Sequence, residues 1–309
     1  MDIVVEKFTR KYGAQRAVDN ISFRVKTGEV LGFLGPNGAG KTTTMKAITT
    51  FLAPTSGDIK VGPYSVSENP DEVRRLTGYL PETNPLYPEM PVIDYLKFVA
   101  RIYGIPSSKI PEKIYEMIEV CGLMAEKHKK IGELSKGYKQ RVGLAQAMIH
   151  DPAVLILDEP TSGLDPNQIV EIRELIKRIG REKTVILSSH ILAEVEATCD
   201  RILIINRGRI VADGSSTDLR KRAQGKEVLH ACIEDADPNL VFEALKELTT
   251  VELVDFVKGR DNYFSIQSYS DRSSRREVFQ LCRDKNWFLT ELTPLETKLE
   301  DVFRELTMN

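Results

Sequence analysis

A glycine-rich loop near the N-terminus constrains the fold more than any other segment of this chain. It matches the pattern G-x-x-x-x-G-K-[ST] and directly follows the apolar run 30–34. Its residues are Gly35, Pro36, Asn37, Gly38, Ala39, Gly40, Lys41 and Thr42, and Thr43 opens the following helix. Glycines at this spacing let backbone N–H groups turn inward around an anion. The loop therefore predicts a nucleotide phosphate site, with Lys41 on the β- and γ-phosphates and Thr42 on Mg²⁺.

Strand and helix patterns alternate through the first two-thirds of the chain. Short β-branched runs predict strands at 29–34, 154–157, 184–187 and 202–205. Segments of helical spacing predict helices that include 92–103, 112–120, 142–148 and 169–179. This alternation is typical of an α/β domain with parallel strands. Segments 3–8 and 17–25 alternate apolar and polar residues and predict an antiparallel flap, whereas the region of about 85–150 predicts a helical subdomain.

The last third of the chain has the pattern of a second, smaller domain. A turn at 206–208 and a polar stretch through residue 225 predict a linker before it. The expected elements are strand 228–233, helix 240–248, strands 251–257 and 263–267, helix 275–285, strand 287–292 and a closing helix 295–306. The order βαββαβ is that of a ferredoxin-like α+β fold. We expect a first domain at 1–222 and an accessory domain at 226–309.

Two carboxylates follow the predicted strand 154–157. They are Asp158 and Glu159. An enzyme with a phosphate-binding loop needs a carboxylate at the end of a neighbouring strand, and we expect Asp158 to hold Mg²⁺ there. Glu159 is then placed to polarise the attacking water as a general base.

The composition excludes several classes of protein. The chain has 309 residues, with 43 Lys and Arg against 45 Asp and Glu and a formal net charge of -2. This balance disfavours binding of nucleic acid through a global basic field. The four cysteines form no C-x-x-C pair, which fits thiols of a reducing compartment. The N-terminus lacks a signal-peptide pattern and no apolar run approaches about 18 residues, so we expect a cytoplasmic protein.

The ordered motifs resemble the ATP-binding cassette of ABC transporters over about residues 1–220. The segment Leu134-Ser135-Lys136-Gly137-Tyr138 is similar to the LSGGQ signature of that family. Taken alone, Ser135 is an ordinary helix-capping residue. The resemblance implies instead that Ser135 and Gly137 face the γ-phosphate held by the opposite subunit of a dimer. It also implies a P-loop NTPase fold with a RecA-like core, an antiparallel flap and a helical subdomain, with ATP and Mg²⁺ as cofactors.

Further positions resemble functional residues of the family. Tyr12 resembles the aromatic residue that stacks on adenine, although alone it would be an ordinary strand-end tyrosine. Asp165, in Gly163-Leu164-Asp165, resembles the D-loop residue that couples the two sites of a dimer. His190 resembles the switch histidine that contacts the γ-phosphate, whereas a lone histidine there is more often structural. The implied catalytic residues are Glu159, His190 and Lys41.

Two features depart from the usual family pattern. Where many cassettes have glutamine in the lid loop, this chain has Glu82. A carboxylate can still ligate Mg²⁺ but only accepts hydrogen bonds, so its contact with the attacking water differs. Lys136 and Tyr138 replace a glycine and a glutamine of the signature, which puts any contact of that glutamine in doubt.

The Glu82 lid and the appended tail, with its ending 299–307, resemble the drug-export branch of the family. Within that branch, the run 128–138 resembles the gliding-motility-associated ATP-binding subunits. The ending also predicts a packing helix of the tail domain, with one apolar stripe formed by Leu295, Leu299, Val302, Phe303 and Leu306. The resemblance implies an ATPase that dimerises, as a homodimer or with a second cassette, and energises a separate membrane permease. Its implied location is cytoplasmic, on the inner face of the membrane. The alternative is a soluble cassette ATPase that acts on ribosomes or nucleic acid, although we expect no nucleic-acid partner because there is only one Gly-Lys-Thr loop and no heptad pattern. A third alternative is a regulator that binds nucleotide without hydrolysis, which Glu159 disfavours.

Overall fold

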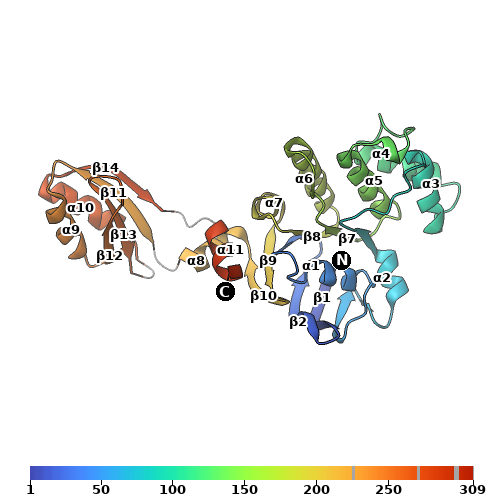
Figure 1. Cartoon of the computed structure of the whole chain (residues 1–309), viewed down its shortest axis with the longest axis horizontal. Helices are drawn as coiled ribbons and strands as arrows, with labels where there is room; N and C mark the ends of the chain where they lie inside the picture. Colours follow the sequence, from blue (N-terminus) through green and yellow to red (C-terminus); the bar gives the residue numbers. More distant parts are fainter. Residues whose placement is uncertain (225–226, 270–271, 296–298, 309) are drawn as a thin grey trace. The chain divides into compact units, whose positions relative to one another are not determined.

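The computed structural model describes residues 1–224, 227–269, 272–295 and 299–308 (Figure 1). Two compact units make up this part of the chain. The first comprises Met1–Ser216 together with the C-terminal residues from Phe303, and the second comprises Thr217–Val302. The units differ from the predicted ranges 1–222 and 226–309 in where they place residues 217–222 and the C-terminal helix.

A six-stranded sheet forms the centre of the first unit (Figure 1). Its order is β10-β9-β3-β8-β7-β6, with bounds Arg209–Gly214, Arg201–Asn206, Val30–Leu34, Thr184–Ser189, Val154–Asp158 and Thr77–Leu80. Neighbours are parallel except β10, which pairs antiparallel with β9. Every residue of β3, β7 and β8 is buried, as expected for parallel strands that are covered on both faces. The predicted parallel core is confirmed.

Helices α6 (Pro166–Gly180) and α7 (Leu192–Thr198) connect strands of this sheet, β7 to β8 and β8 to β9, whereas α1 (Lys41–Ile48) leads from β3 to the flap. The turn into α1 requires glycine, because Gly40 has a φ of 110° and a Cβ there would lie 2.7 Å from the Ala17 carbonyl oxygen. Because α1 starts directly after the glycine-rich loop, the backbone N–H groups of its first turn face the space above β3.

The predicted antiparallel flap is also confirmed. Its sheet has the order β2-β1-β4-β5, with bounds Gln15–Val25, Ile3–Tyr12, Ser56–Val61 and Tyr64–Ser65. Strands β4 and β5, together with α2 (Pro70–Leu76) and β6 of the central sheet, are elements that the sequence patterns did not predict. In β4 only Ile59 and Val61 are buried, and Gly57 interrupts the pattern with a φ of 79°. So short an alternation gives no clear strand signal.

Three helices form the predicted helical subdomain. Their bounds are Val92–Ile102 for α3, Ile110–Val120 for α4 and Lys136–Met148 for α5, with a short 3₁₀ turn at Ile131–Glu133. Helix α5 contains the predicted helical segment 142–148 and begins at Lys136. The Ser135 hydroxyl accepts a hydrogen bond from Tyr138 N at 3.4 Å and caps the first turn, which confirms the capping interpretation of Ser135. None of the described helices combines the length and the hydropathy that a membrane span needs.

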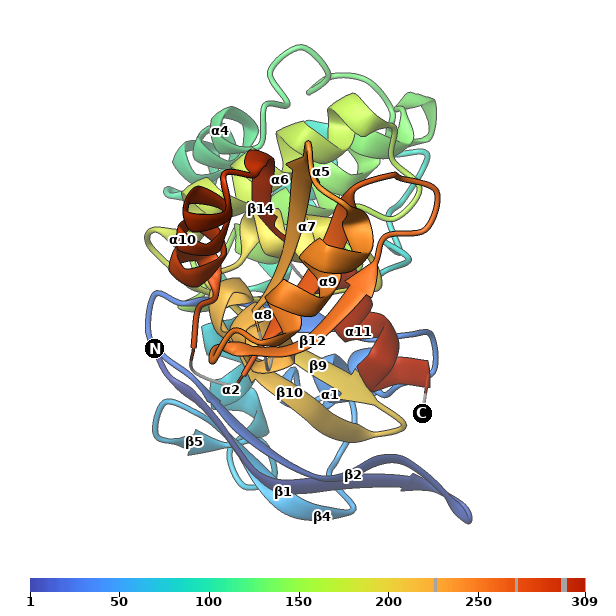
Figure 2. The same ribbon diagram turned by 90° about the vertical axis from the view of Figure 1, so that its left-hand side faces the viewer.

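The second unit has the predicted ferredoxin-like arrangement. Its antiparallel sheet has the order β12-β13-β11-β14, with bounds Val251–Phe256, Tyr263–Ser268, Val228–Glu234 and Phe288–Pro294. Helices α9 (Pro238–Lys246) and α10 (Arg275–Lys285) lie on one face, which Figure 2 views from the helix side. Their buried residues Val241, Leu245, Val278 and Cys282 pack against Phe264 and its neighbours in the sheet. The fourth, first, third and second strands adjoin in that order, as the βαββαβ fold requires.

The predicted linker through residue 225 is wrong for most of its length. Residues Ser216–Gln224 form helix α8. One leucine anchors the start of this helix, since Leu219 is only 2% exposed. Leu219 lies in a segment of mostly polar residues, which produces no clear helical periodicity and explains why the sequence pattern indicated a linker.

The C-terminal helix α11 (Leu299–Met308) is predicted to be a packing helix of the second domain, but only its first residues belong to the second unit. Residues from Phe303 belong to the first unit. The side-chain amide of Asn206, at the end of β9, donates to the carbonyl oxygens of Leu306 at 3.2 Å and Thr307 at 3.4 Å. These bonds satisfy helix-end carbonyls that have no partner within the helix. The predicted apolar stripe also included Val302, whose side chain lies outside the described ones.

His150, directly after α5, is a half-buried histidine with one ring nitrogen bonded. Its Nε2 lies 3.2 Å from the Thr77 carbonyl oxygen, and its ring stacks on Tyr103 with centroids 3.9 Å apart. Among the described residues, Nδ1 has no hydrogen-bond partner although it is buried. Burial lowers the pKa of His150, and the charge of Lys183 lowers it further. The hydrogen bond to the Thr77 carbonyl oxygen and the charge of Asp151 act in the opposite direction, but the net shift is downward. The folded chain therefore favours the neutral imidazole.

We expect His150 to lower the free energy of unfolding as the pH falls from 7.5 to 5.5. Below an unfolded-state pKa of about 6.5, the unfolded chain binds a proton that the folded site binds only at a lower pH. The resulting change in the free energy of unfolding is at most about 1.4 kcal/mol per pH unit. Urea unfolding of the wild type and of His150→Phe, which keeps an aromatic ring on Tyr103, measures this slope. The variant should lose part of the pH dependence, and identical slopes would contradict the lowered pKa.

Candidate nucleotide-binding site

A pocket of about 510 Å³ lies at the carboxyl ends of β3, β7 and β8. Its lining residues come from the glycine-rich loop and from the segments that follow β6, β7 and β8. They are Ala17, Asn37, Gly38, Gly40, Lys41, Thr42, Thr43, Glu82, Glu159, Ser162 and His190. Most of the predicted phosphate-binding and catalytic side chains therefore share one hollow, at the edge where open α/β sheets bind their ligands.

Lys41 is a buried cation held at the base of the loop. Its Nζ donates to the carbonyl oxygens of Gly35 at 2.7 Å and Pro36 at 3.3 Å. The same atom lies 3.4 Å from Glu159 Oε1, and the two side chains are 5% and 8% exposed. A buried ammonium with these partners is fixed in place and can attract a phosphate through a strong charge-assisted contact.

Asp158 ends β7 at the floor of the site and is fully buried. Its Oδ1 accepts hydrogen bonds from Ser188 Oγ at 2.6 Å and Thr42 Oγ1 at 3.2 Å. Its Oδ2 is buried without a hydrogen-bond partner among the described residues. An unsatisfied buried carboxylate oxygen beside the Thr42 hydroxyl fits a divalent cation, since Mg²⁺ takes one or two protein oxygens together with phosphate oxygens.

Glu159 follows Asp158 in a backbone conformation that is uncommon for this residue type, with a φ of 49°. Its backbone N–H donates to Ser188 Oγ at 3.0 Å, which holds the turn after β7. Its Oε2 lies 2.9 Å from His190 Nδ1. The imidazole is 45% exposed whereas the carboxylate is 8% exposed, so His190 lies between Glu159 and solvent.

Two of the residues around Asp158 were not predicted. Ser188 pairs with Asp158 in the register of β7 and β8, which explains its contacts with both carboxylate-bearing residues. Tyr79 is the other, and burial followed by the Asp158 charge raises the pKa of its phenol. Of the two, only Ser188 has a signal in the sequence, because two serines end a mostly apolar strand directly before His190.

Eight predicted residues do not line this pocket. Gly35, Pro36 and Ala39 belong to the loop, and the buried Asp158 contacts the lining residue Thr42. The other four are Tyr12, Ser135, Gly137 and Asp165. Tyr12 is 46% exposed and lies under the Arg10 guanidinium, 5.0 Å from the ring centroid. Ser135 and Asp165 cap helices α5 and α6, and Asp165 Oδ1 accepts from Gln168 N at 2.9 Å. A Cβ on Gly137 would lie 2.7 Å from Gln168 Cδ, so Gly137 packs closely against the end of the Gln168 side chain on α6. Each has a local structural role in this chain.

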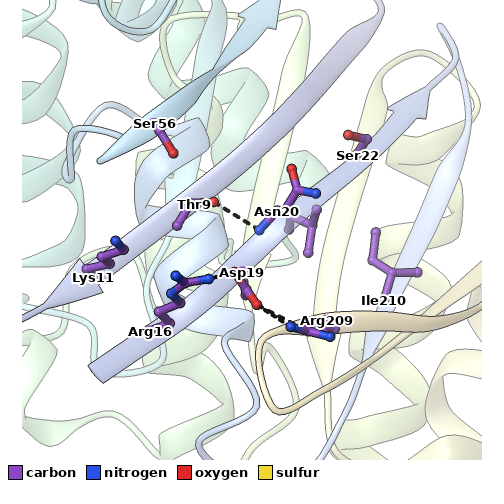
Figure 3. Close-up of a pocket in the computed structure, with 10 residues that line it drawn as sticks. Thr9, Lys11, Arg16, Asp19, Asn20, Ser22, Ser56, Arg209 and Ile210 are labelled. Atoms are coloured by element: carbon purple, nitrogen blue, oxygen red, sulfur yellow. Dashed lines mark hydrogen bonds and ion pairs between the residues drawn. The ribbon is translucent and has the colours of Figure 1, made fainter. Parts of the chain in front are cut away.

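A larger hollow of about 810 Å³ lies between the flap and β10, and none of the predicted site residues lines it (Figure 3). Asp19 Oδ2 accepts from Arg209, at 3.0 and 2.7 Å, and Oδ1 accepts from Arg16 at 2.8 Å. The hydrogen bond from Arg209, then that from Arg16, lowers the pKa of Asp19. The two guanidinium groups are thus paired with a carboxylate of the chain, and the smaller pocket remains the candidate phosphate site.

Comparisons with known proteins agree with this geometry. A sequence model described as "ABC transporter" matches residues 18–162, and another, described as "AAA domain, putative AbiEii toxin, Type IV TA system", matches residues 130–196. The bacitracin transport ATP-binding protein BcrA of Bacillus licheniformis is 34% identical over 300 residues, which cover 96% of this chain and 94% of BcrA. The chain belongs to the ABC transporter ATP-binding protein family.

Other members of the ABC family support the same assignment. The uncharacterized ABC transporter ATP-binding protein YxlF of Bacillus subtilis is 41% identical over 220 residues, 71% of this chain and 73% of YxlF. A solved structure titled "Structure of ATP binding subunit of ABC transporter" is 32% identical, with a TM-score of 0.65 over 72% of this chain and 93% of that one. The predicted cassette fold is therefore confirmed. The chain is an ATP-binding protein and an ATPase of the cassette type.

Proposed function

We propose that this ABC ATP-binding protein dimerises around two molecules of Mg-ATP and energises a separate membrane permease, as part of an exporter. One observation carries the proposal. Lys41, Glu159 and His190 line one pocket, whereas Ser135 and Gly137 of the same chain do not line it. A second copy that presents its own helix start near Ser135 would complete the enclosure of the γ-phosphate, because exposed N–H groups at a helix N-terminus bind anions.

Within each pocket we assign the chemistry to named side chains. Lys41 binds the β- and γ-phosphates, and Asn37 to Thr43 hold them through backbone N–H groups. Glu159 accepts a proton from the attacking water, and His190 orients that carboxylate and contacts the γ-phosphate. Tyr12 stacks on the adenine ring, and Asp165 links the two sites across the dimer. Glu159 is near enough to the Lys41 ammonium and the His190 imidazole for all three groups to act on one water.

Magnesium fits the donors at the floor of the pocket. Thr42, Asp158 and Glu82 would hold the ion, and their oxygen atoms are the type that Mg²⁺ prefers. When bound, the ion supplies positive charge to the phosphate oxygens. The buried Oδ2 of Asp158, which has no partner among the described residues, is the observation that supports this ligand.

An exposed apolar patch on the helical subdomain supports a protein partner. Tyr87 is 49% exposed and its ring contacts that of Phe98, at 5.6 Å between centroids. Ile102, one turn further along α3, is 66% exposed. Clustered apolar side chains on a surface mark interaction sites, and we assign this patch to the permease. The name bacitracin transport ATP-binding protein, and that of the linearmycin resistance ATP-binding protein LnrL of Bacillus subtilis, favour export.

Purification of the tagged native chain from membranes tests this function. We expect a multi-spanning protein to co-purify, and Phe98→Asp to reduce its yield because a charge then enters the patch. Phe279→Asp, which adds the same charge at a 58% exposed residue of the second unit, is the matched control and should leave the yield unchanged. Recovery of ribosomal proteins without a membrane protein would favour the soluble alternative and overturn the proposal.

A further inference from the structure

Glu194 is a buried carboxylate near the pocket that the site described above does not use. It lies on α7 and is 7% exposed. One oxygen, Oε2, accepts hydrogen bonds from two hydroxyl groups, Thr161 Oγ1 at 2.6 Å and Ser189 Oγ at 3.0 Å. All three side chains are buried. Glu194 therefore joins two segments that are far apart in the sequence.

These two segments carry the proposed catalytic pair. Thr161 lies two residues after Glu159, and Ser189 directly precedes His190. Ser189 Oγ also accepts from Ile191 N at 3.0 Å, so the serine holds the turn around His190. Two further contacts join the same segments: Glu159 Oε2 lies 2.9 Å from His190 Nδ1, and Glu159 N donates to Ser188 Oγ at 3.0 Å. Among these contacts, the hydrogen bonds to Glu194 link the residues beyond the catalytic pair, Thr161 and Ser189.

A carboxylate at this buried position stabilises the fold less than an apolar residue would, if it only fills space in the core. Burial removes this carboxyl group from water, and no lysine, arginine or histidine of the described residues forms an ion pair with it. Its partners are neutral hydroxyl groups, which compensate only part of the lost hydration. Buried charged groups of this kind are stabilising less often than well-packed apolar residues. The placement indicates a role in the geometry of the site.

We propose that Glu194 is a positioning residue for ATP hydrolysis. It holds the segments at Thr161 and Ser189 together and so fixes the Glu159 carboxylate relative to the His190 imidazole. It does not touch the nucleotide, because it lies behind the pocket and not among its lining residues. This inference rests on the roles that we propose for Glu159 and His190.

The first test is the kinetics of Glu194→Ala. We expect kcat for ATP to fall by about 10- to 100-fold, because small displacements of catalytic groups have effects of that size. The dissociation constant of ATP should change less than about twofold, because Lys41 and the glycine-rich loop keep their contacts. Glu194→Gln should restore most of kcat, since its amide oxygen can accept both hydroxyl groups. A rise in the dissociation constant with unchanged kcat would contradict the proposal.

The second test is a double-mutant cycle with His190→Ala, which separates positioning from a general effect on folding. If Glu194 acts through His190, Glu194→Ala should lower kcat by less than about twofold in the His190→Ala background. Thr198→Val is the control, because the Thr198 hydroxyl donates only to the Glu194 backbone oxygen within α7 and this variant should keep the wild-type kcat. If the double variant instead loses kcat by the product of the two single-variant factors, the proposal is wrong.

Two further results make the outcome unambiguous. If Glu194→Ala does not fold, Thr161→Val replaces it in the test, because this variant removes one of the two hydrogen bonds to Glu194. We expect Thr161→Val to lower kcat less than Glu194→Ala, and we expect this effect to disappear likewise in the His190→Ala background. If Glu159→Gln retains wild-type hydrolysis, the proposed function of the site has failed. If Glu159→Gln is inactive but the kcat losses of Glu194→Ala and His190→Ala multiply in the double variant, only the positioning role of Glu194 has failed.

Discussion

Replacing Glu159 with glutamine lowers the rate of ATP hydrolysis by about 10²- to 10⁴-fold, the usual contribution of a general base. Glutamine keeps the shape of the side chain but cannot accept a proton from water. The dissociation constant of ATP should stay close to the wild-type value, because Lys41 keeps its contacts with the Gly35 and Pro36 carbonyl oxygens. Steady-state phosphate release and calorimetric titration with ATP measure the two quantities.

Glu182→Gln is the matched control for this result. Glu182 is an exposed glutamate of the same unit, and its change should leave hydrolysis unaffected. Near-normal turnover in Glu159→Gln would falsify the assignment of Glu159 as the base. A loss of ATP binding equal to the loss of turnover would instead indicate that the carboxylate mainly stabilises the pocket through Lys41.

Replacing Lys41 with alanine weakens ATP binding itself. A charge-assisted hydrogen bond contributes about 1.5–3 kcal/mol, which corresponds to an increase of roughly 10- to 100-fold in the dissociation constant. The removed ammonium is buried, 5% exposed, so solvent screens its contact with phosphate little. Calorimetric titration with Mg-ATP measures the effect directly.

Lys46→Ala is the control for this charge. Lys46 lies on the same helix, with its Nζ 5.7 Å from the centre of the Phe51 ring, and does not line the pocket. This variant should bind ATP like the wild type. Equal affinities of Lys41→Ala and the wild type would remove Lys41 from the site. Thermal unfolding of both variants is needed as well, because Lys41→Ala also leaves the buried Glu159 without its cation.

The sequence predicted those parts of the fold that have long or continuous patterns. Strands β3, β7, β8 and β9 are apolar runs, and the ferredoxin-like unit has alternating strands of ordinary length, so their periods are clear. Strand β4 and helix α8 were not predicted, because a glycine interrupts the strand and the helix consists mostly of polar residues. Their stability comes from tertiary contacts, which local propensity does not report.

For the candidate site, local motifs identified the residues that bear charge but not those that position them. Lys41, Asp158 and Glu159 lie in a loop and at a strand end that local patterns reveal. Ser188 and Glu194 contact these segments only because β7 and β8 are neighbours and α7 packs beside them. The spacing of a single sequence does not contain that information, since strand order is set by the whole sheet.

The central claim is that two chains enclose ATP between the glycine-rich loop of one and the Ser135 segment of the other. The most direct measurement is sedimentation of Glu159→Gln with and without Mg-ATP, because a variant that binds but does not hydrolyse ATP accumulates the bound state. We expect a monomer without nucleotide and a dimer with it. A chain that stays monomeric at saturating Mg-ATP, alone and with its co-purified permease, would contradict the claim.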